Sequence, residues 1–237
     1  MSYLGTLSKM KSQLGSPVEY QLPVGEHLLP LNERIGSTLK MTFTGNIFCD
    51  NCGKKTKKSF YQGYCFPCMK KLARCDMCVM KPEICHYDQG TCREPEWGDT
   101  HCMIDHFVYL SNTSGLKVGI TRHSQVPTRW IDQGATQALP IFKVRTRLIS
   151  GLLEVALAKH VADKTNWRAM LKGDNEPLDL VAEAQRLSSD ITSAIDDIRL
   201  RFGEDAVTAI DADIVDIKYH VLTFPQKISS FNFYKSP

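Results

Sequence analysis

The stretch C-D-N-C, residues 49–52, followed by C-F-P-C, residues 65–68, decides the fold of the middle of this chain. Each Cys-x2-Cys pair places two thiolates on one tight turn, and two such turns facing each other supply the four ligands of a tetrahedral zinc ion. The sequence therefore predicts a closed zinc ribbon with Cys49, Cys52, Cys65 and Cys68 as ligands. Because four thiolates leave no open coordination position, this zinc is expected to stabilise the fold and not to carry chemistry.

A second metal site has more candidate ligands than it needs, because nine cysteines less the four of the ribbon leave five. We favour Cys75, Cys78, Cys85 and Cys92, since Pro82 and Gly90 can turn the chain back between the paired and the single ligands. Three other side chains can replace one of these ligands: His86, His101 and Cys102. The sequence thus predicts about two structural zinc ions per chain.

The same cysteines would form disulfides in a secreted protein. Residues 1–15, however, contain no apolar core and no small-residue cleavage site of a secretory signal. We therefore expect a cytoplasmic protein whose thiolates bind metal. No apolar run approaches the roughly 18 residues of a membrane-spanning helix, so no membrane partner is expected.

Charge is segregated along the chain behind a net charge of only +3. Residues 53–81 hold eight basic side chains and one acid, whereas residues 174–216 hold twelve acids and three arginines. The basic segment interleaves lysines with aromatic side chains: Lys54, Lys55, Lys57 and Lys58 with Phe60, Tyr61, Tyr64 and Phe66. This composition favours contact with a nucleic acid, through phosphates and stacked bases. The alternative is that the lysines balance the thiolate charge and the aromatic rings cover a small core.

Periodicity predicts an α+β chain in four parts. Residues 1–48 form a small β segment, with alternating strands at Val18–Val24 and Leu39–Phe48, and residues 49–105 hold the two metal sites. Residues 106–173 form a central domain, and residues 174–237 a C-terminal helix followed by strands.

The expected elements of the last two parts follow from hydrophobic spacing and from glycine and proline punctuation. Strands are predicted at Phe107–Leu110, Leu116–Thr121, Phe142–Arg147, Ile214–Phe224 and Ile228–Tyr234. Helices are predicted at Thr128–Gln133, Ile149–Val161 and Leu178–Phe202.

The central domain resembles the GIY-YIG nuclease core. The resemblance rests on the order of its elements and on two strings, Val108-Tyr109-Leu110 and Lys117-Val118-Gly119-Ile120-Thr121, followed by Arg129 and Glu154. It implies that Tyr109 positions or deprotonates a water, that Arg129 clamps the scissile phosphate, and that Glu154 holds Mg2+ or Mn2+. Lys117 stands where many of these nucleases have a second tyrosine, and His123 stands where they often have a second proton-transfer group.

The chain as a whole is similar to the bacterial domain-of-unknown-function family 2797. The similarity covers most of residues 5–235 and rests on several strings: Cys-x2-Cys-Gly with Lys-Lys-Ser-Phe, Gln-Gly-Tyr-Cys-x2-Cys, Gly90–Arg93, Thr128–Ala135 and Lys164–Trp167. The family name implies no activity. The sequence alone therefore supports two hypotheses: a zinc protein that binds nucleic acid and cleaves it with Mg2+ or Mn2+, or a non-catalytic adaptor for nucleic acid or protein with structural zinc sites.

Overall fold

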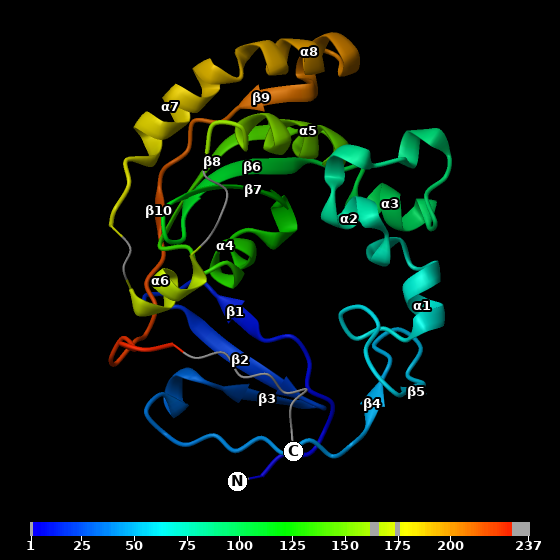
Figure 1. Cartoon of the computed structure of the whole chain (residues 1–237), viewed down its shortest axis with the longest axis vertical. Coiled ribbons are helices and arrows are strands. Elements are labelled where there is room, and N and C mark those ends of the chain that lie inside the picture. The colour runs from blue at the N-terminus through cyan, green and yellow to red at the C-terminus, as the bar shows by residue number, and fades with distance from the viewer. Residues whose placement is uncertain (1, 162–165, 174–175, 229–237) are drawn as a thin grey trace.

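The computed structural model describes residues 2–161, 166–173 and 176–228. Its centre is an antiparallel sheet with strand order β10-β8-β6-β7, in which β9 also pairs with β8. The strands are β6 (His106–Asn112), β7 (Leu116–Arg122), β8 (Gln137–Val144), β9 (Val207–Ala209) and β10 (Val215–Asp216). Figure 1 shows α5, α7 and α8 beyond one side of this sheet and α4 on the other. The α+β class predicted from the sequence is confirmed.

Alternation of side chains along β6 divides the core into two layers, since successive residues of a strand point to opposite faces. Val108 and Leu110 pack in one cluster with apolar residues of three helices: α5 (Arg147–Leu157), α7 (Leu180–Asp190) and α8 (Thr192–Phe202). Tyr109 lies in the other cluster with Trp130 and Ile131. Those two residues belong to α4 (Thr128–Asp132). The sheet therefore has one face that packs on α5, α7 and α8 and a second face that carries Tyr109.

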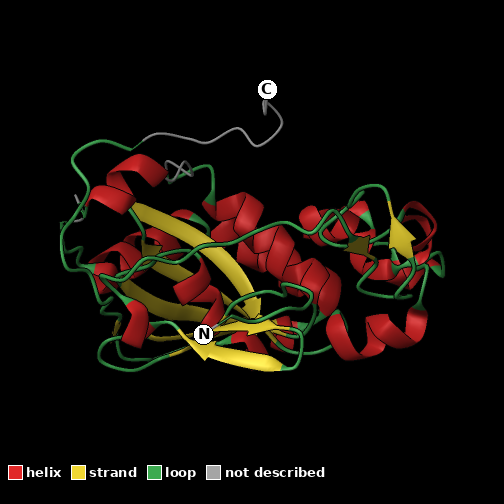
Figure 2. Ribbon diagram, turned by 90° about the horizontal axis from the view of Figure 1, so that it is seen from below, coloured by secondary structure: helices red, strands yellow, loops and turns green. Residues whose placement is uncertain are grey.

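Two smaller parts flank this sheet (Figures 1 and 2). The N-terminal sheet consists of β1 (Lys11–Gln13), β2 (Glu19–Val24) and β3 (His27–Pro30). The cysteine-rich part contains β4 (Ile47–Phe48), β5 (Lys55–Thr56), α1 (Phe66–Lys71), α2 (Met77–Met80) and α3 (Pro95–His101). Figure 2 shows this cysteine-rich part beside the sheets and not stacked on them.

Helix α5 is also the surface on which the second half of the cysteine-rich part rests. A Cβ added to Gly151 would lie 2.5 Å from the backbone nitrogen of Glu83 and 2.6 Å from Pro82, so only glycine permits this close approach. Arg147, at the start of α5, donates from Nη2 to the carbonyl of Val79 at 2.6 Å and from its backbone N–H to the carbonyl of Cys102 at 2.8 Å. The cysteine-rich part is thereby attached to the sheet domain.

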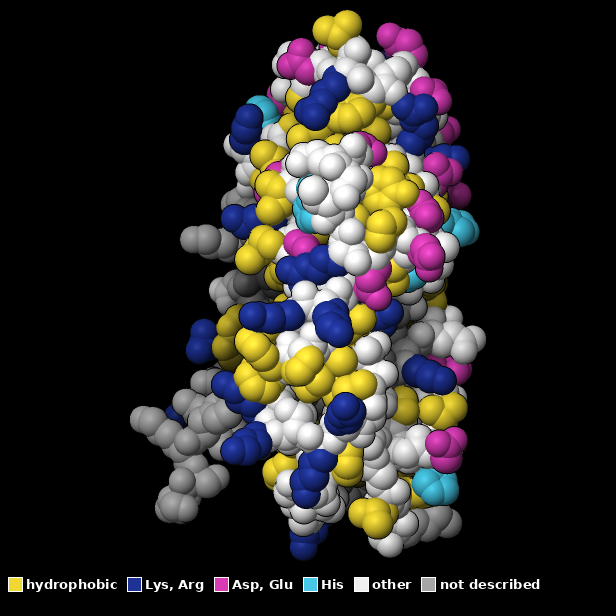
Figure 3. All heavy atoms as spheres, turned by 90° about the vertical axis from the view of Figure 1, so that its right-hand side faces the viewer, with side chains coloured by type: hydrophobic (Ala, Val, Ile, Leu, Met, Phe, Trp, Pro, Cys, Tyr) yellow, Lys and Arg dark blue, Asp and Glu magenta, His cyan; other side chains and the backbone are white. Residues whose placement is uncertain are grey.

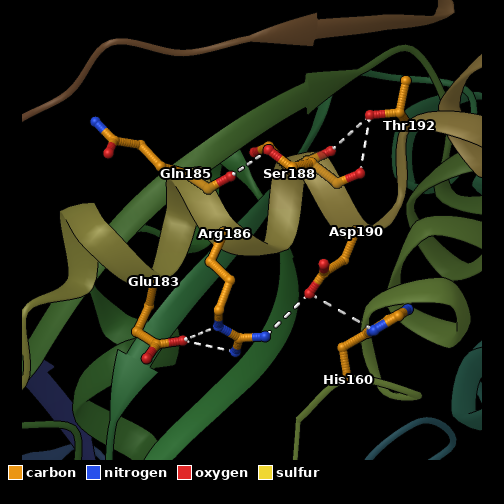
Figure 4. Close-up of polar contacts among 8 residues, drawn as sticks. His160, Glu183, Gln185, Arg186, Ser188, Asp190 and Thr192 are labelled. Atoms are coloured by element: carbon orange, nitrogen blue, oxygen red, sulfur yellow. Dashed lines mark hydrogen bonds and ion pairs between the residues drawn. The ribbon is translucent and has the colours of Figure 1, made fainter.

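The predicted helix Leu178–Phe202 is two helices, α7 and α8, which meet at Ile191. The Thr192 hydroxyl donates to the carbonyls of Ser188 and Ser189, at 3.2 and 3.0 Å (Figure 4). Such back-bonding by Thr competes with the helical hydrogen bonds and bends a helix. The apolar spacing continues across the break because both helices cover the same core, and periodicity alone therefore did not reveal it.

Several predicted strands have other bounds. Of Leu39–Phe48, only β4 forms, which pairs with β5; Met41 and Phe43 are more than 70% exposed, because residues 39–46 pair with no strand of the described chain. The strand predicted at Phe142–Arg147 is β8, which ends at Val144, because the Thr146 hydroxyl caps α5 by accepting from the Ile149 N–H. Ile214–Phe224 contains only β10, and Ile228–Tyr234 lies, apart from Ile228, outside the described residues.

The segments predicted as central and C-terminal parts share one sheet and one core. Strands β9 and β10 come from the second of these segments and both pair with β8 from the first. A further helix, α6 (Trp167–Lys172), lies between them in sequence. Within the part of the chain that the structure describes, no helix is long and apolar enough to cross a bilayer.

Candidate functional site

Four cysteines meet between the ribbon strands and α1. Cys49 follows β4, Cys65 stands just before α1, and Cys68 lies inside α1. With Cys52 they bring four sulfur atoms within 4.8 Å of one another. The sulfur atoms of Cys52 and Cys65 are 3.8 Å apart. A tetrahedral zinc ion with Zn–S bonds of about 2.3 Å requires sulfur separations of roughly 3.8 Å, so this cluster (the Cys49 cluster) fits a structural zinc ion.

Two sulfur atoms of the Cys49 cluster also accept hydrogen bonds from N–H groups. The backbone N–H of Cys65 donates to Cys49 Sγ at 3.3 Å, and Asn51 Nδ2 donates to Cys68 Sγ at 3.5 Å. The first of these bonds lowers the pKa of the Cys49 thiol to about 6. The Asn51 amide likewise lowers the pKa of Cys68, but burial and the neighbouring thiols outweigh it and raise that pKa to about 12. In the absence of metal the cluster therefore holds protons that a bound cation would displace.

The other cysteines divide between two places. Cys75 is half-buried against the Cys49 cluster and Leu72. Cys78, Cys85, Cys92 and Cys102 line a separate small cavity, together with Asp76 and His86. The structure therefore brings three of the four ligands predicted for the second site together with Cys102, which the sequence left as an alternative, and it places Cys75 elsewhere.

The two candidate histidines have protein partners. His86 lies in the second cavity, where Nδ1 is 2.7 Å from Thr91 Oγ1 and Nε2 is 3.6 Å from Asp76 Oδ1. His86, Asp76 and Cys78 also offer ligand atoms within 4.8 Å of one another. His101 instead stacks on Trp97 within α3, and its Nδ1 lies 3.0 Å from the Trp97 carbonyl.

The predicted basic surface is exposed. Lys54, Lys55, Lys57 and Lys58 are all exposed around β5. Figure 3 shows that on this side of the molecule Lys and Arg side chains gather in the lower half, with hydrophobic side chains among them, whereas Asp and Glu lie mostly above. The charge segregation found in the sequence is therefore also a segregation in space.

Two aromatic rings stand within this basic surface. Phe60 and Phe66 are 40% and 44% exposed, and their ring centroids lie 5.4 Å apart. The ammonium of Lys58 lies 4.9 Å from the Phe60 ring and that of Lys70 lies 4.8 Å from the Phe66 ring. We call these four residues the Phe60–Phe66 platform.

Tyr109 is held at the centre of the sheet. It pairs across β6 and β7 with Gly119, where an added Cβ would lie 2.5 Å from the tyrosine ring and hydroxyl, so glycine is required there. The Tyr109 hydroxyl donates to Gln133 Oε1 at 2.7 Å, and the residue is fully buried. Burial raises the pKa of Tyr109 well above its usual value. The hydroxyl is therefore a buried hydrogen-bond donor in this structure.

The other four predicted catalytic residues lie on different elements around Tyr109. Arg129, exposed on α4, lowers the pKa of the Tyr109 hydroxyl, and the charge of Glu154 raises it, so both lie within electrostatic reach. Lys117 is half-buried on β7, opposite Ser111 and thus on the Tyr109 face. His123 is exposed just after β7, with its ring 5.6 Å from Phe107. Glu154 comes from α5, in the layer across the sheet.

Some supporting residues carry no signal that sequence spacing could isolate. Asn51 contacts sulfur only because the turn of the first Cys-x2-Cys pair faces α1. Gln133 meets Tyr109 because α4 packs on β6. Asp76 is the exception, since an aspartate directly before a short helix is a typical cap, and its side chain accepts from the Cys78 N–H.

Comparison with known proteins finds one family. The model of the family described as Protein of unknown function (DUF2797) matches residues 36–237. No curated protein matches the chain, and no solved structure matches it.

Proposed function

Because the chain belongs to the DUF2797 family of proteins of unknown function, its function has to be argued from its own residues, and we propose that it is a zinc-containing nucleic-acid-binding protein. The observation that carries this proposal is the Phe60–Phe66 platform, in which two exposed rings are flanked by two lysines. Unpaired bases stack on such rings, and lysines beside them meet the phosphates that follow.

The alternative role of the lysines is to balance the charge of a zinc ion bound by four thiolates. Two features favour a ligand. Lys58 and Lys70 hold their ammonium groups over phenylalanine rings, 4.9 and 4.8 Å from the ring centroids. The rings themselves remain 40% and 44% exposed, although rings that served only to cover the ribbon core would be expected to be buried.

Binding is tested by fluorescence anisotropy with labelled 20-nucleotide single-stranded DNA and RNA and with duplex DNA at several salt concentrations. Replacing Lys54, Lys55, Lys57 and Lys58 together by Gln should weaken binding for all sequences. It should also reduce the slope of log affinity against log salt by up to about 3 for single strands, since each phosphate contact contributes roughly 0.7.

The matched control replaces four exposed lysines outside the ribbon: Lys159, Lys172, Lys218 and Lys227. It changes the net charge equally, so it should reduce affinity much less and leave the slope close to that of the wild type. Equal effects of the two quadruple variants would show that only net charge matters and would contradict a ribbon surface.

The Tyr109 face carries a second candidate function, metal-dependent nuclease activity of the GIY-YIG type. The succession β6, β7, α4, β8, α5 supports a GIY-YIG-like arrangement. Tyr109, Arg129 and Glu154 are electrostatically coupled across that arrangement. In this proposal Glu154 would hold Mg2+ or Mn2+, which supplies charge stabilisation when bound, and Arg129 would clamp the phosphate. Lys117 and His123 would assist from the face of the sheet that carries Tyr109.

Cleavage assays separate the enzyme from an adaptor. With Mg2+ or Mn2+, Glu154→Ala should abolish cleavage of single-stranded, duplex or branched substrates while leaving binding and zinc content unchanged. Arg129→Ala should weaken binding as well as turnover, because a phosphate clamp acts in both the ground and the transition state. If the wild type cuts none of these substrates, or both variants cut equally well, the non-catalytic adaptor for nucleic acid or protein is the better description.

A further inference from the structure

The second cysteine cavity lies between the ribbon and α5 and is separate from the Cys49 cluster. It is a cavity of about 10 Å³, so it holds no more than a water molecule or a single ion. Four of its lining side chains are cysteines from different local elements. Cys78 lies in α2, Cys85 and Cys92 each follow a short 3-10 turn, and Cys102 ends α3.

Contacts among the thiols show that these cysteines converge. The Cys85 thiol interacts with the thiols of both Cys78 and Cys102, and all three side chains line the same cavity as Cys92. Cys92 in turn interacts electrostatically with Cys102. We propose that Cys78, Cys85, Cys92 and Cys102 bind a second structural zinc ion and that Cys75 is not a ligand of it.

Cys75 is excluded by its surroundings. It packs with the Cys49 cluster and Leu72, and the charges that act on it come from Arg93, Arg74, Glu94 and Cys49. In sequence it forms a Cys-x2-Cys pair with Cys78, but the 3-10 turn Ala73–Cys75 ends at Cys75, and Asp76 is extended before α2 begins. The pair is therefore divided between two places and does not form one metal-binding turn.

His86 lines the same cavity, but both of its ring nitrogens already face oxygen atoms. Nδ1 is 2.7 Å from Thr91 Oγ1, and Nε2 faces Asp76 at 3.6 Å. Asp76 also accepts from Arg93 Nε at 2.7 Å, so His86, Asp76 and Arg93 form a polar network beside the thiols. Such a network orients the ligands of a metal site without supplying one.

Cations nearby match the charge of four thiolates around Zn2+. The guanidinium groups of Arg147 and Arg122 both interact electrostatically with the Cys102 thiol. Arg147 also bonds the carbonyls of Val79 and Cys102. The proposed ion therefore joins four short segments that have few buried apolar side chains of their own, and it secures them on α5 at Gly151.

The experiment measures zinc and iron per chain by elemental analysis in purified full-length protein and in single variants. Wild type, Cys75→Ser and His86→Ala should each hold about two zinc ions, and Cys92→Ser and Cys102→Ser about one. Loss of a zinc ion in Cys75→Ser would overturn this ligand set. Loss of a zinc ion in His86→Ala would also overturn it if Cys92→Ser kept both zinc ions. Iron in place of zinc would overturn the identity of the metal, because four thiolates also bind iron.

Alkylation of the zinc-loaded wild type, followed by peptide mapping, keeps the test decisive if Cys102→Ser does not fold. Cys75 should already be alkylated before a chelator removes the zinc, and faster afterwards, because the ribbon beside it unfolds. Cys78, Cys85 and Cys92 should react only after the removal, together with the Cys49 cluster. Protection of Cys75 that ends on chelation, or reaction of Cys92 before it, would contradict the assignment. Because neither measurement involves nucleic acid, failure here is independent of failure of the proposed function.

Discussion

The ribbon around the Cys49 cluster and the sheet domain around β6 and α5 are stabilised in different ways. The buried apolar cluster of the ribbon consists of three cysteines and Leu72. That of the sheet domain extends from Val108 through α5 and α7 to Val207. A module as small as the ribbon buries too little surface to fold on that basis, and a zinc ion bound by the Cys49 cluster would supply the missing free energy. The comparison sets a part that we expect to depend on metal against a part stabilised by packing.

The strongest way to separate the two regions is to remove the metal from the ribbon. Cys65→Ser should lose one zinc ion and unfold residues 49–72, because binding of structural zinc supplies the folding free energy, roughly 10 kcal/mol or more in zinc-finger peptides. Elemental analysis and amide hydrogen exchange measure the two effects. Residues 106–157 should keep the exchange protection of the wild type.

Cys75→Ser is the matched control, since it removes a half-buried thiol beside the same cluster. It should leave protection of the ribbon unchanged. If Cys65→Ser also exposed the amides of β6 and β8, the two regions would be one cooperative unit, and the comparison would not hold.

The converse change perturbs the sheet domain and spares the metal. Leu153 is fully buried in the cluster against α5, so Leu153→Ala should lower the free energy of unfolding by roughly 2–5 kcal/mol through lost burial and a cavity. Zinc content should not change. Val155→Ala, at a 44% exposed position of the same helix, should change the stability by less than about 0.5 kcal/mol. Denaturant titration followed by tryptophan fluorescence would show the difference, and similar midpoints for both variants would contradict it.

The junction of the two regions should respond to pH through His106. This side chain is fully buried at the start of β6, and its Nδ1 lies 2.7 Å from the Ile104 carbonyl. Burial lowers the pKa of His106 to about 4, with help from Arg147 and Arg122. Between pH 6.5 and 4 the unfolded chain therefore binds the proton that the folded chain does not, so stability should fall as the pH falls through this range, by up to about 3 kcal/mol.

The histidine contribution is isolated by a difference between proteins, because acid also protonates thiolates. His106→Gln should show a smaller loss of stability than the wild type when the pH is lowered from 6.5 to 4.5. Thermal or denaturant unfolding at each pH measures this loss. Equal pH dependence in the two proteins would mean that His106 titrates normally in the folded state.

Local spacing explains how well each region was predicted from the sequence. The Cys49 cluster follows from two Cys-x2-Cys pairs, because each pair is a turn of four residues that needs little else to form. The helices α4 and α5 and the strands β6 and β7 follow from apolar spacing and from Pro127, Gly134 and Gly115. The break at Ile191 and the end of β8 did not follow, because they depend on the hydroxyls of Thr192 and Thr146, which spacing of apolar residues does not register.

What the sequence by itself determined is therefore what a few neighbouring residues can specify: the four-cysteine cluster, the α+β class, the family and the separation of basic from acidic segments. Only the tertiary structure decided which distant side chains meet. It placed Cys102 with Cys78 and Cys85, buried Tyr109 against Gly119, and left Phe60 and Phe66 exposed beside lysines. These contacts depend on how α3, α5 and the sheet pack together, and packing is a property of the whole chain that the spacing of residues within one segment does not contain.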